Sequence, residues 1–271
     1  MHKQISIIGL GWLGLPLAKH LLNEGYAIKG STTSEEKLIE LKKNGLDAFK
    51  ILIDENEIQG DIEECLRASE ISIINIPPGL RRNPKSNYVA KIKNIINHVE
   101  KSSVQKVLFI SSTSVFNAAK SFPVITNDTE PKSTTIAGMQ ISKIEKLLLY
   151  NSNFSTTILR LAGLIDERRH PVTMLTKKKN ILNPEAPVNL IHLNDCIGIC
   201  SAIIAQEKWS KIYNAAHPFH PKKNEYYKKQ ALKRGLNEPN FDFSKESEGK
   251  FIDGNDTAKA LDYEYKCNID F

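Results

Sequence analysis

The sequence predicts an α/β fold in which helices cover both faces of a doubly wound parallel sheet. Apolar segments typical of strands alternate with amphipathic segments typical of helices through the first 165 residues. The first strand-like segment ends directly in a glycine-rich turn, "GLGWLG" (residues 9–14). The segment "QKVLFISSTSVF" (residues 105–116) is apolar on both faces, which is typical of a central strand in a parallel sheet. These patterns together indicate right-handed βαβ units.

The predicted elements follow one another along the whole chain. We expect strands at residues 4–11, 26–33, 47–53, 69–78, 105–116, 155–165, 188–193 and 211–217, and helices at residues 12–25, 34–45, 87–102, 140–151, 194–206 and 224–235. Two long polar connections interrupt the pattern, at residues 117–137 and 166–187. We therefore expect a cofactor domain at residues 1–165, completed by about 188–216, and a smaller substrate lobe from residues 166–187 and 217–271.

Composition narrows the class of protein. The 271 residues are 41% hydrophobic and 25% charged, as in soluble globular proteins. The net charge is +6, but the basic residues are scattered and form no stripe, which disfavours a nucleic-acid partner. No apolar run approaches the roughly 20 residues of a spanning helix, and no signal peptide is recognisable, so we expect a cytoplasmic protein without a membrane partner. The four cysteines show no metal-ligand spacing, and no metal site is predicted.

The glycine-rich turn is predicted to bind the diphosphate of a dinucleotide. Gly9 would permit the tight turn, Gly11 would let the backbone approach the diphosphate, and Gly14 would let the helix pack close to the strand. The helix would begin near Trp12 and Leu13. The N–H groups of its first turn, at the positive end of the helix, would then face the anion. Trp12 is either a hydrophobic cover on the first turn or a wall beside the bound dinucleotide.

The end of the second strand should discriminate NAD from NADP. A protein that binds NAD usually carries an acid there, on the ribose hydroxyls. Here the strand is expected to end at Thr33, and Thr33 with Glu36 forms a capping-box pattern that occupies Glu36 locally. Hydroxyl groups around Thr33 and the cation of Lys37 suit a 2′-phosphate, so we expect NADP. If Glu35 reached the ribose instead, the cofactor would be NAD.

Several stretches together resemble the NAD(P)-dependent epimerase/dehydratase family, in the extended and atypical branches of the short-chain dehydrogenase/reductase superfamily. They are "GLGWLG", "NIPPG", "VLFISSTSVF", "SKIEKLL", "ILRLAGLI" and "VNLIHLND", and they cover nearly the whole chain in order. The resemblance implies a Rossmann-like domain that binds the cofactor and a smaller C-terminal substrate lobe. It also implies cofactor contacts at Pro77, Pro78 and Ser111.

The chemistry of the resembled family uses a serine or threonine, a tyrosine and a lysine. The resemblance matches the serine to Ser112, with Thr113 beside it, and the lysine to Lys143, which would also hold the nicotinamide ribose. The tyrosine position is then Met139, whose thioether has no proton to give. Tyr88, His170 and His192 are candidates by residue type for a replacement acid.

Basic residues that follow two predicted strands are candidate substrate ligands. Arg81 follows the fourth strand, and Arg168 and His170 follow the strand at residues 155–165. Cations at these strand ends could bind a phosphorylated or nucleotide-linked substrate, although a solvated loop is the alternative.

Two classes of function are compatible with these features. The first is an NAD(P)-dependent oxidoreductase, epimerase or dehydratase that acts on a small polar or nucleotide-linked carbonyl or hydroxyl compound. The second is a dinucleotide-binding sensor or regulatory module that has lost the catalytic tyrosine. The oligomeric state stays open.

Overall fold

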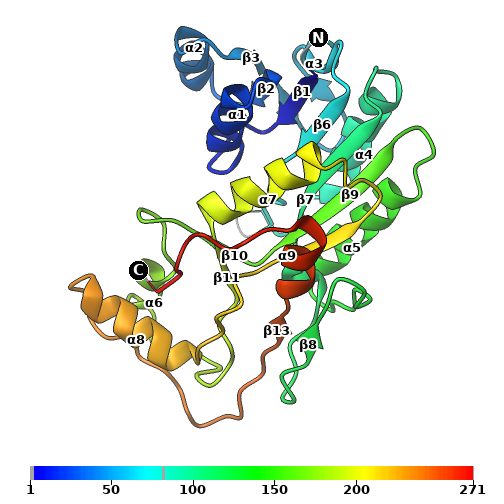
Figure 1. Ribbon diagram of the computed structural model, residues 1–271. Coiled ribbons are helices and arrows are strands. Elements are labelled where there is room, and N and C mark those ends of the chain that lie inside the picture. The colour runs from blue at the N-terminus through cyan, green and yellow to red at the C-terminus, as the bar shows by residue number, and fades with distance from the viewer. Residues whose placement is uncertain (1–2, 81–82, 271) are drawn as a thin grey trace. The chain divides into compact units, whose positions relative to one another are not determined.

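The central sheet of this computed structural model confirms the predicted doubly wound fold. The structure describes residues 3–80 and 83–270. Seven strands lie in the order β12-β9-β7-β6-β1-β2-β3, and each described pair from β7 to β3 is parallel (Figure 1). Their bounds are β1 Gln4–Ile8, β2 Ala27–Thr32, β3 Asp47–Lys50, β6 Ile71–Ile74, β7 Lys106–Ser112, β9 Ser155–Leu161 and β12 Ile212–Ala215.

Helices separate these strands, as the alternating pattern predicts. Their bounds are α1 Gly14–Asn23, α2 Glu35–Lys43, α3 Ile62–Leu66, α4 Tyr88–Glu100, α5 Ile136–Leu149, α6 Val172–Leu175, α7 Leu193–Ala205, α8 Lys223–Lys233 and α9 Asn255–Leu261, with one 3₁₀ turn, η1, at Thr113–Val115. Helices α4 and α5 lie side by side (Figure 1). No helix within the described ranges is both long and apolar enough to span a bilayer.

Burial explains why the central strands form where they do. All four residues of β6 are buried, and four of the five residues of β1 are buried. Strand β7 buries Val107, Leu108 and Phe109 in succession. Such continuous apolar segments suit strands that are covered on both faces, so the sequence pattern and the sheet position agree.

Three predicted strands differ from the observed ones. The segment at residues 47–53 contains β3 and then β4 (Leu52–Ile53), which pairs antiparallel with β5 (Ile58–Gln59) in a separate hairpin. The segment at residues 155–165 contains β9 and then β10 (Gly163–Ile165), which pairs with β11 (Leu190–His192). The predicted strand at residues 188–193 is therefore this β11, outside the central sheet. The periodicity of apolar residues does not reveal where a continuous apolar segment changes from one strand partner to another.

The chain groups into two compact units. Unit 1 contains residues 1–115, 133–159 and 203–212, and unit 2 contains residues 116–132, 160–202 and 213–271. Unit 1 carries the glycine-rich turn together with α4 and α5. Unit 2 includes two small parallel sheets, β10–β11 and β8 (Val124–Ile125) with β13 (Phe251–Ile252). Residues 116–132, 160–165, 188–202 and 213–216, which we expected to belong to the cofactor domain, group with unit 2.

Unit 2 has a hydrophobic core of its own. Helix α8 contributes Tyr226, Tyr227 and Ala231 to it, and Ile269 from the C-terminal segment packs there too. This core secures the late helix that the sequence predicts at residues 224–235.

Candidate functional site

The turn between β1 and α1 has the geometry that the three glycines predict. Gly9 has a φ of +110°, and a Cβ atom added there would lie 2.5 Å from the carbonyl oxygen of Asn75. A Cβ atom at Gly14 would lie 2.1 Å from the carbonyl oxygen of Gly9. Around Gly11, by contrast, such an atom would have nothing within 4 Å. The first and third glycines are thus required by the fold, whereas the second leaves open space beside the backbone.

Two side chains from neighbouring strands hold this turn. Sequence reasoning considered Ser31 only among the hydroxyl groups around Thr33 and missed Asn75. The Gly9 N–H donates to Ser31 Oγ at 2.9 Å, and Asn75 Nδ2 donates to the Gly9 carbonyl at 3.1 Å. Ser31 belongs to β2 and Asn75 follows β6, the two strands that flank β1. Polar residues at the carboxyl ends of predicted neighbouring strands were the available signal.

The first turn of α1 has no side-chain cap. The helix begins at Gly14 rather than at Trp12, and its N-cap residue Leu13 is buried and accepts no capping bond through its side chain. Trp12 is half-buried. Backbone N–H groups at such a helix start can bind an anion.

The end of β2 corrects one detail of the sequence prediction. Strand β2 ends at Thr32, and Thr33 is exposed. The N-cap of α2 is Ser34, whose Oγ accepts from the Lys37 N–H at 3.3 Å, so the predicted Thr33–Glu36 capping box is wrong. Serine one residue later satisfies the same helical donor, which a sequence pattern cannot distinguish.

Two charged side chains at the start of α2 have different partners. Lys37 Nζ donates to the carbonyl oxygen of Leu10, within the glycine-rich turn itself. Glu35 forms an ion pair with Lys50 at 2.9 Å. Thus a cation lies against the turn, while the nearest acid that could have selected NAD is paired with a lysine of β3.

The ends of β6 and β7 carry further predicted cofactor and catalytic residues. After β6, Pro77 is exposed and Pro78 is half-buried; Arg81 lies outside the described residues. In β7, Ser111 is buried and its Oγ donates to Glu145 Oε1 of α5 at 2.5 Å.

Ser112 remains accessible. It is half-buried, as is Thr113 in η1, and its Oγ accepts from the Ser114 N–H at 3.1 Å. Because that bond uses a lone pair, the Ser112 hydroxyl proton can still be donated to a bound oxygen atom.

Helix α5 packs on β7 and η1 and leaves Lys143 on its exposed face. Its buried face consists of Gly138, Ile141, Ile144, Glu145 and Leu148. Met139 and Lys143 are exposed, and both line a surface hollow with residues of α4. Met139 and Lys143 therefore lie on the exposed face of the helix, and the roles expected for this tyrosine position and for Lys143 stay predictions.

Two of the side chains that could replace the missing acid, Tyr88 and His192, already make contacts within the protein. Tyr88 is buried, its hydroxyl donates to the Ile76 carbonyl at 2.6 Å, and burial raises the pKa of that phenol. His192 is 2% exposed; its Nδ1 accepts from the Asn194 N–H at 3.2 Å and its Nε2 lies 3.4 Å from Glu167 Oε1.

The two described candidate substrate ligands of unit 2 lie in different surroundings. Arg168 is exposed on a loop whose backbone is held by Asp166. His170 is 4% exposed, with Nε2 3.0 Å from the Tyr226 hydroxyl and Nδ1 accepting from the Val172 N–H. Burial, assisted by the nearby Arg234, lowers the pKa of His170 to about 4. His170 is thus a neutral core residue, which corrects the expectation of a substrate ligand.

The four cysteines form no disulfide in the described structure. Cys65, Cys196 and Cys200 are buried and Cys267 is half-buried, all as free thiols. Among the residues the structure describes, no group of three or more His, Cys, Asp or Glu side chains could hold a metal ion.

Comparison with known proteins identifies the family. A family model described as NAD(P)H-binding matches residues 9–189, which include the whole of the glycine-rich turn. The chain belongs to this NAD(P)H-binding family. Protein YeeZ of Escherichia coli (strain K12) is 30% identical over 267 residues, covering 97% of this chain and 96% of that protein.

Solved structures place the NAD(P)H-binding chain among proteins of the epimerase fold. It resembles UDP-glucose 4-epimerase of Thermotoga maritima, solved with UDP-glucose, with a TM-score of 0.76 and 17% identity over 98% of this chain and 95% of that one. It also resembles UDP-glucuronic acid 4-epimerase of Bacillus cereus, solved in complex with NAD, with a TM-score of 0.77 and 17% identity over 98% and 93%. The Rossmann-like fold and the resemblance predicted from the sequence are confirmed.

Proposed function

We propose that this NAD(P)H-binding chain holds NADP(H) at its glycine-rich turn and acts on a small polar or nucleotide-linked carbonyl or hydroxyl compound. The observation that carries the proposal is the open space beside Gly11, on a turn fixed by Gly9 and Gly14. A diphosphate bound there would meet backbone N–H groups at the positive end of α1.

The preference for NADP(H) rests on the end of β2. Lys37 contacts the turn through the Leu10 carbonyl, and Thr33 beside it is an exposed hydroxyl. A 2′-phosphate at this place would find a cation, a hydroxyl and the N-terminus of α2. Glu35, the acid that would favour NAD, is paired with Lys50.

Titration of the protein with NADPH and NADH tests this preference. We expect Lys37→Ala to weaken NADPH binding about tenfold, or about 1.4 kcal/mol, because one charge-assisted contact is lost. NADH binding should change little, which separates loss of the phosphate contact from damage to the turn. Lys19→Ala, on the exposed side of α1, is the matched control. An equal loss for both dinucleotides would contradict the proposed role of Lys37.

At the substrate end we propose that Ser112 orients the reacting oxygen atom. Its hydroxyl can donate to a carbonyl or alcohol oxygen, but an alcohol of this kind does not supply a proton at neutral pH. Because α5 faces Met139 and Lys143 outward, the proton would come from water. Hydride transfer between the nicotinamide and the substrate carbon would then be slower than in an enzyme with a positioned acid.

The nucleotide-linked substrate is suggested by the similar solved structures, one of which holds UDP-glucose. Arg168, which is exposed, is our candidate cation for a phosphorylated ligand in unit 2. Turnover of NADPH with keto-sugar nucleotides and with simple aldehydes and ketones would test the substrate class. Ser112→Ala should lower kcat/KM at least tenfold, while leaving NADPH binding intact.

A dinucleotide-binding sensor is the second candidate, and the outward position of Met139 and Lys143 favours it. It predicts tight NADPH binding with no turnover on any carbonyl compound of the panel. Turnover that depends on Ser112 would exclude this candidate.

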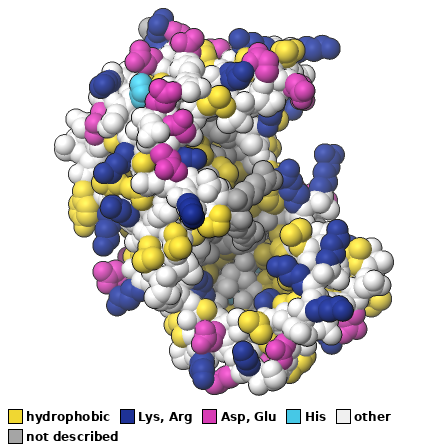
Figure 2. Space-filling view, turned by 180° about the vertical axis from the view of Figure 1, so that it is seen from behind, with side chains coloured by type: hydrophobic (Ala, Val, Ile, Leu, Met, Phe, Trp, Pro, Cys, Tyr) yellow, Lys and Arg dark blue, Asp and Glu magenta, His cyan; other side chains and the backbone are white. Residues whose placement is uncertain are grey.

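Figure 2 bears on the expectation of no nucleic-acid partner. On the face it draws, lysine and arginine side chains are dispersed among acidic ones rather than gathered in one stripe. The absence of a nucleic-acid partner therefore remains our proposal for this protein. We expect no specific binding to duplex DNA, and binding that is tight and steeply salt-dependent would contradict the proposal.

A further inference from the structure

An ion pair joins the end of β3 to the start of α2. Lys50, the last residue of β3, has its Nζ 2.9 Å from Oε2 of Glu35, the first residue of α2. Lys50 lies opposite Thr32, the last residue of β2, and the Ile51 N–H donates to the Thr32 carbonyl at 2.9 Å. The pairing of the two strands therefore fixes Lys50 at the strand ends where the ribose of a dinucleotide is expected.

The fold does not depend on this ion pair. The side chains of Lys50 and Glu35 are 43% and 58% exposed, and ion pairs as exposed as these add little to stability. Glu35 lies in the first turn of α2, where the helix dipole already favours a carboxylate, and Ser34 caps the helix. The pair therefore matters chiefly for a charged group that approaches these strand ends from outside the chain.

Glu35 and a 2′-phosphate would compete for the same place. Both are anions, and both suit the N-terminus of α2. An unpaired acid after the second strand is the group that selects NAD, because it accepts hydrogen bonds from the ribose hydroxyls, and it would repel a phosphate. Lys50 counters the repulsion because it neutralises the carboxylate of Glu35.

Lys37, the other cation at the start of α2, has a different contact. Its side chain is half-buried, and its Nζ donates to the Leu10 carbonyl in the glycine-rich turn. Lys50 is thus the cation that the structure pairs with Glu35. The two lysines therefore have separate tasks: Lys37 lies against the turn, and Lys50 controls the charge of the neighbouring acid.

We propose that Lys50 sets the cofactor preference by holding Glu35 in an ion pair, so that Glu35 is a latent NAD-selecting acid. With Lys50 in place, a bound dinucleotide meets a neutral pair and the cation of Lys37, which suits the 2′-phosphate of NADPH. Without Lys50, the free carboxylate of Glu35 favours the ribose hydroxyls of NADH and repels that phosphate. Lys50 is a positioning residue in this scheme, since it acts through Glu35. The inference rests on the proposed NADP(H) site and adds the group that controls its selectivity.

Titration of the full chain with NADPH and NADH tests this role of Lys50. We expect Lys50→Ala to lower the ratio of the NADH to the NADPH dissociation constant about tenfold, because Glu35 becomes an unpaired anion beside the bound phosphate. Lys50→Arg, which keeps a cation at the ion pair, should leave the ratio within about threefold of the wild type. An unchanged ratio in Lys50→Ala would overturn the proposal.

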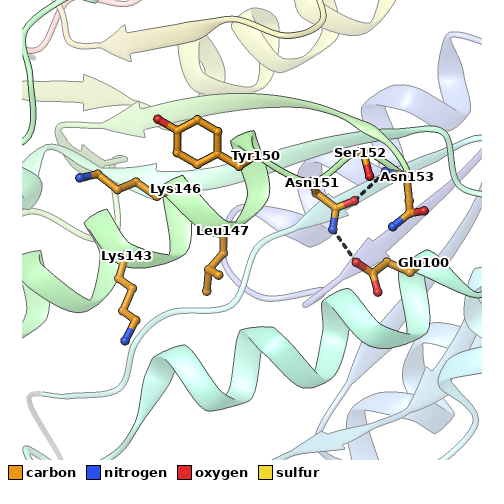
Figure 3. Close-up of a pocket in the computed structure, with 8 residues that line it drawn as sticks. All are labelled: Glu100, Lys143, Lys146, Leu147, Tyr150, Asn151, Ser152 and Asn153. Atoms are coloured by element: carbon orange, nitrogen blue, oxygen red, sulfur yellow. Dashed lines mark hydrogen bonds between the residues drawn. The ribbon is translucent and has the colours of Figure 1, made fainter.

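The matched control is Lys146→Ala on α5. Figure 3 shows Lys146 projecting from that helix, while the acid drawn with it, Glu100, is hydrogen-bonded to Asn151 at 2.6 Å. This variant removes the same charge from an exposed position without releasing an acid. It should leave the ratio unchanged. A fall as large as that of Lys50→Ala would show an effect of total charge and would overturn the proposal.

A double-mutant cycle shows whether Lys50 acts through Glu35. Adding Glu35→Gln to Lys50→Ala should restore the ratio to within about threefold of the wild type, because no unpaired carboxylate remains. If Lys50→Ala has the same effect with and without Glu35→Gln, Lys50 acts independently of Glu35 and the proposal is overturned. The melting temperature without dinucleotide should be the same in every variant, which separates an effect on binding from an effect on folding.

The behaviour of the wild type separates this inference from the proposed function. A wild-type chain that binds neither dinucleotide would contradict the proposed site and this inference with it. A preference for NADPH without coupling between Lys50 and Glu35 would overturn this inference alone. A wild-type preference for NADH would also overturn it, because Glu35 would then select the cofactor although Lys50 is present.

Discussion

At the scale of single residues, the three glycines of the turn have different physical roles. Gly9 and Gly14 are needed because side-chain atoms would collide with the backbone at Asn75 and Gly9. Gly11 has no such neighbour, so its lack of a side chain serves whatever approaches from outside the chain. A motif that looks uniform in sequence is therefore two structural glycines around one that is open to a ligand.

Substitution of the two kinds of glycine should separate stability from binding. We predict that Gly14→Ala lowers the free energy of unfolding by more than about 2 kcal/mol, because its Cβ atom must displace backbone. Gly11→Ala should change that free energy by less than about 0.5 kcal/mol. Urea unfolding of both variants checks this, and equal destabilisation would show that the turn is packed differently.

A second prediction follows from the exposure of Met139 on the outer face of α5. Met139→Tyr should not create or raise carbonyl reductase activity, because the new phenol would lie on the exposed face with Lys143. Lys143→Ala should likewise leave the thermal shift produced by NADPH unchanged. The measurement is NADPH turnover and melting temperature for each variant beside Ser112→Ala. An increase in turnover with Met139→Tyr would indicate that this face of α5 lies at the catalytic centre, which would contradict the prediction.

At the scale of elements, the cap of α2 shows what a sequence pattern resolves. Thr33, Ser34 and Glu36 all suit a helix start, so the pattern predicted the helix correctly and its cap wrongly. The same limit applies to α5. The spacing of "SKIEKLL" predicted a helix, but only packing against β7, through Ser111 and Glu145, determines which residues face inward.

Removal of each hydroxyl in turn tests the observed cap. Ser34→Ala should lower the free energy of unfolding by about 1 kcal/mol, since its bond to the Lys37 N–H is lost. Thr33→Ala should have an effect smaller than about 0.5 kcal/mol, because Thr33 is exposed and precedes the cap. Chemical denaturation of the two variants decides whether Ser34 or Thr33 caps α2. A larger effect for Thr33→Ala than for Ser34→Ala would support the Thr33–Glu36 capping box instead.

At the scale of the whole molecule, the alternation of strands and helices was sufficient to predict the sheet. It could not predict that residues 116–132 group with unit 2, because that grouping depends on contacts with residues far along the chain, such as Ala119 with Gly249. Nor could it predict that His170 is a core residue. Its partners Tyr226 and Ile269 lie in a late helix and in the C-terminal segment, which only the fold brings together.

The buried His170 should make global stability depend on pH. Its pKa is lowered by burial to about 4, below its ordinary value of 6.5, so the unfolded chain binds a proton more readily. This contribution is therefore fully present above about pH 6.5 and is lost as the pH falls toward 4, by up to about 3 kcal/mol. Urea midpoints of the wild type should fall over this range more than those of His170→Gln. Parallel pH profiles for the two proteins would contradict the assignment.

Thermal unfolding with NAD, NADH, NADP and NADPH tests most directly whether the glycine-rich turn binds NADP(H). At 100 times its dissociation constant, a dinucleotide should stabilise the wild-type chain by about 2.7 kcal/mol. We predict the largest shift with NADPH or NADP, and no shift with any of the four in Gly11→Ala, whose own stability should match the wild type. No shift in the wild type, or the same shift in Gly11→Ala, would contradict the account.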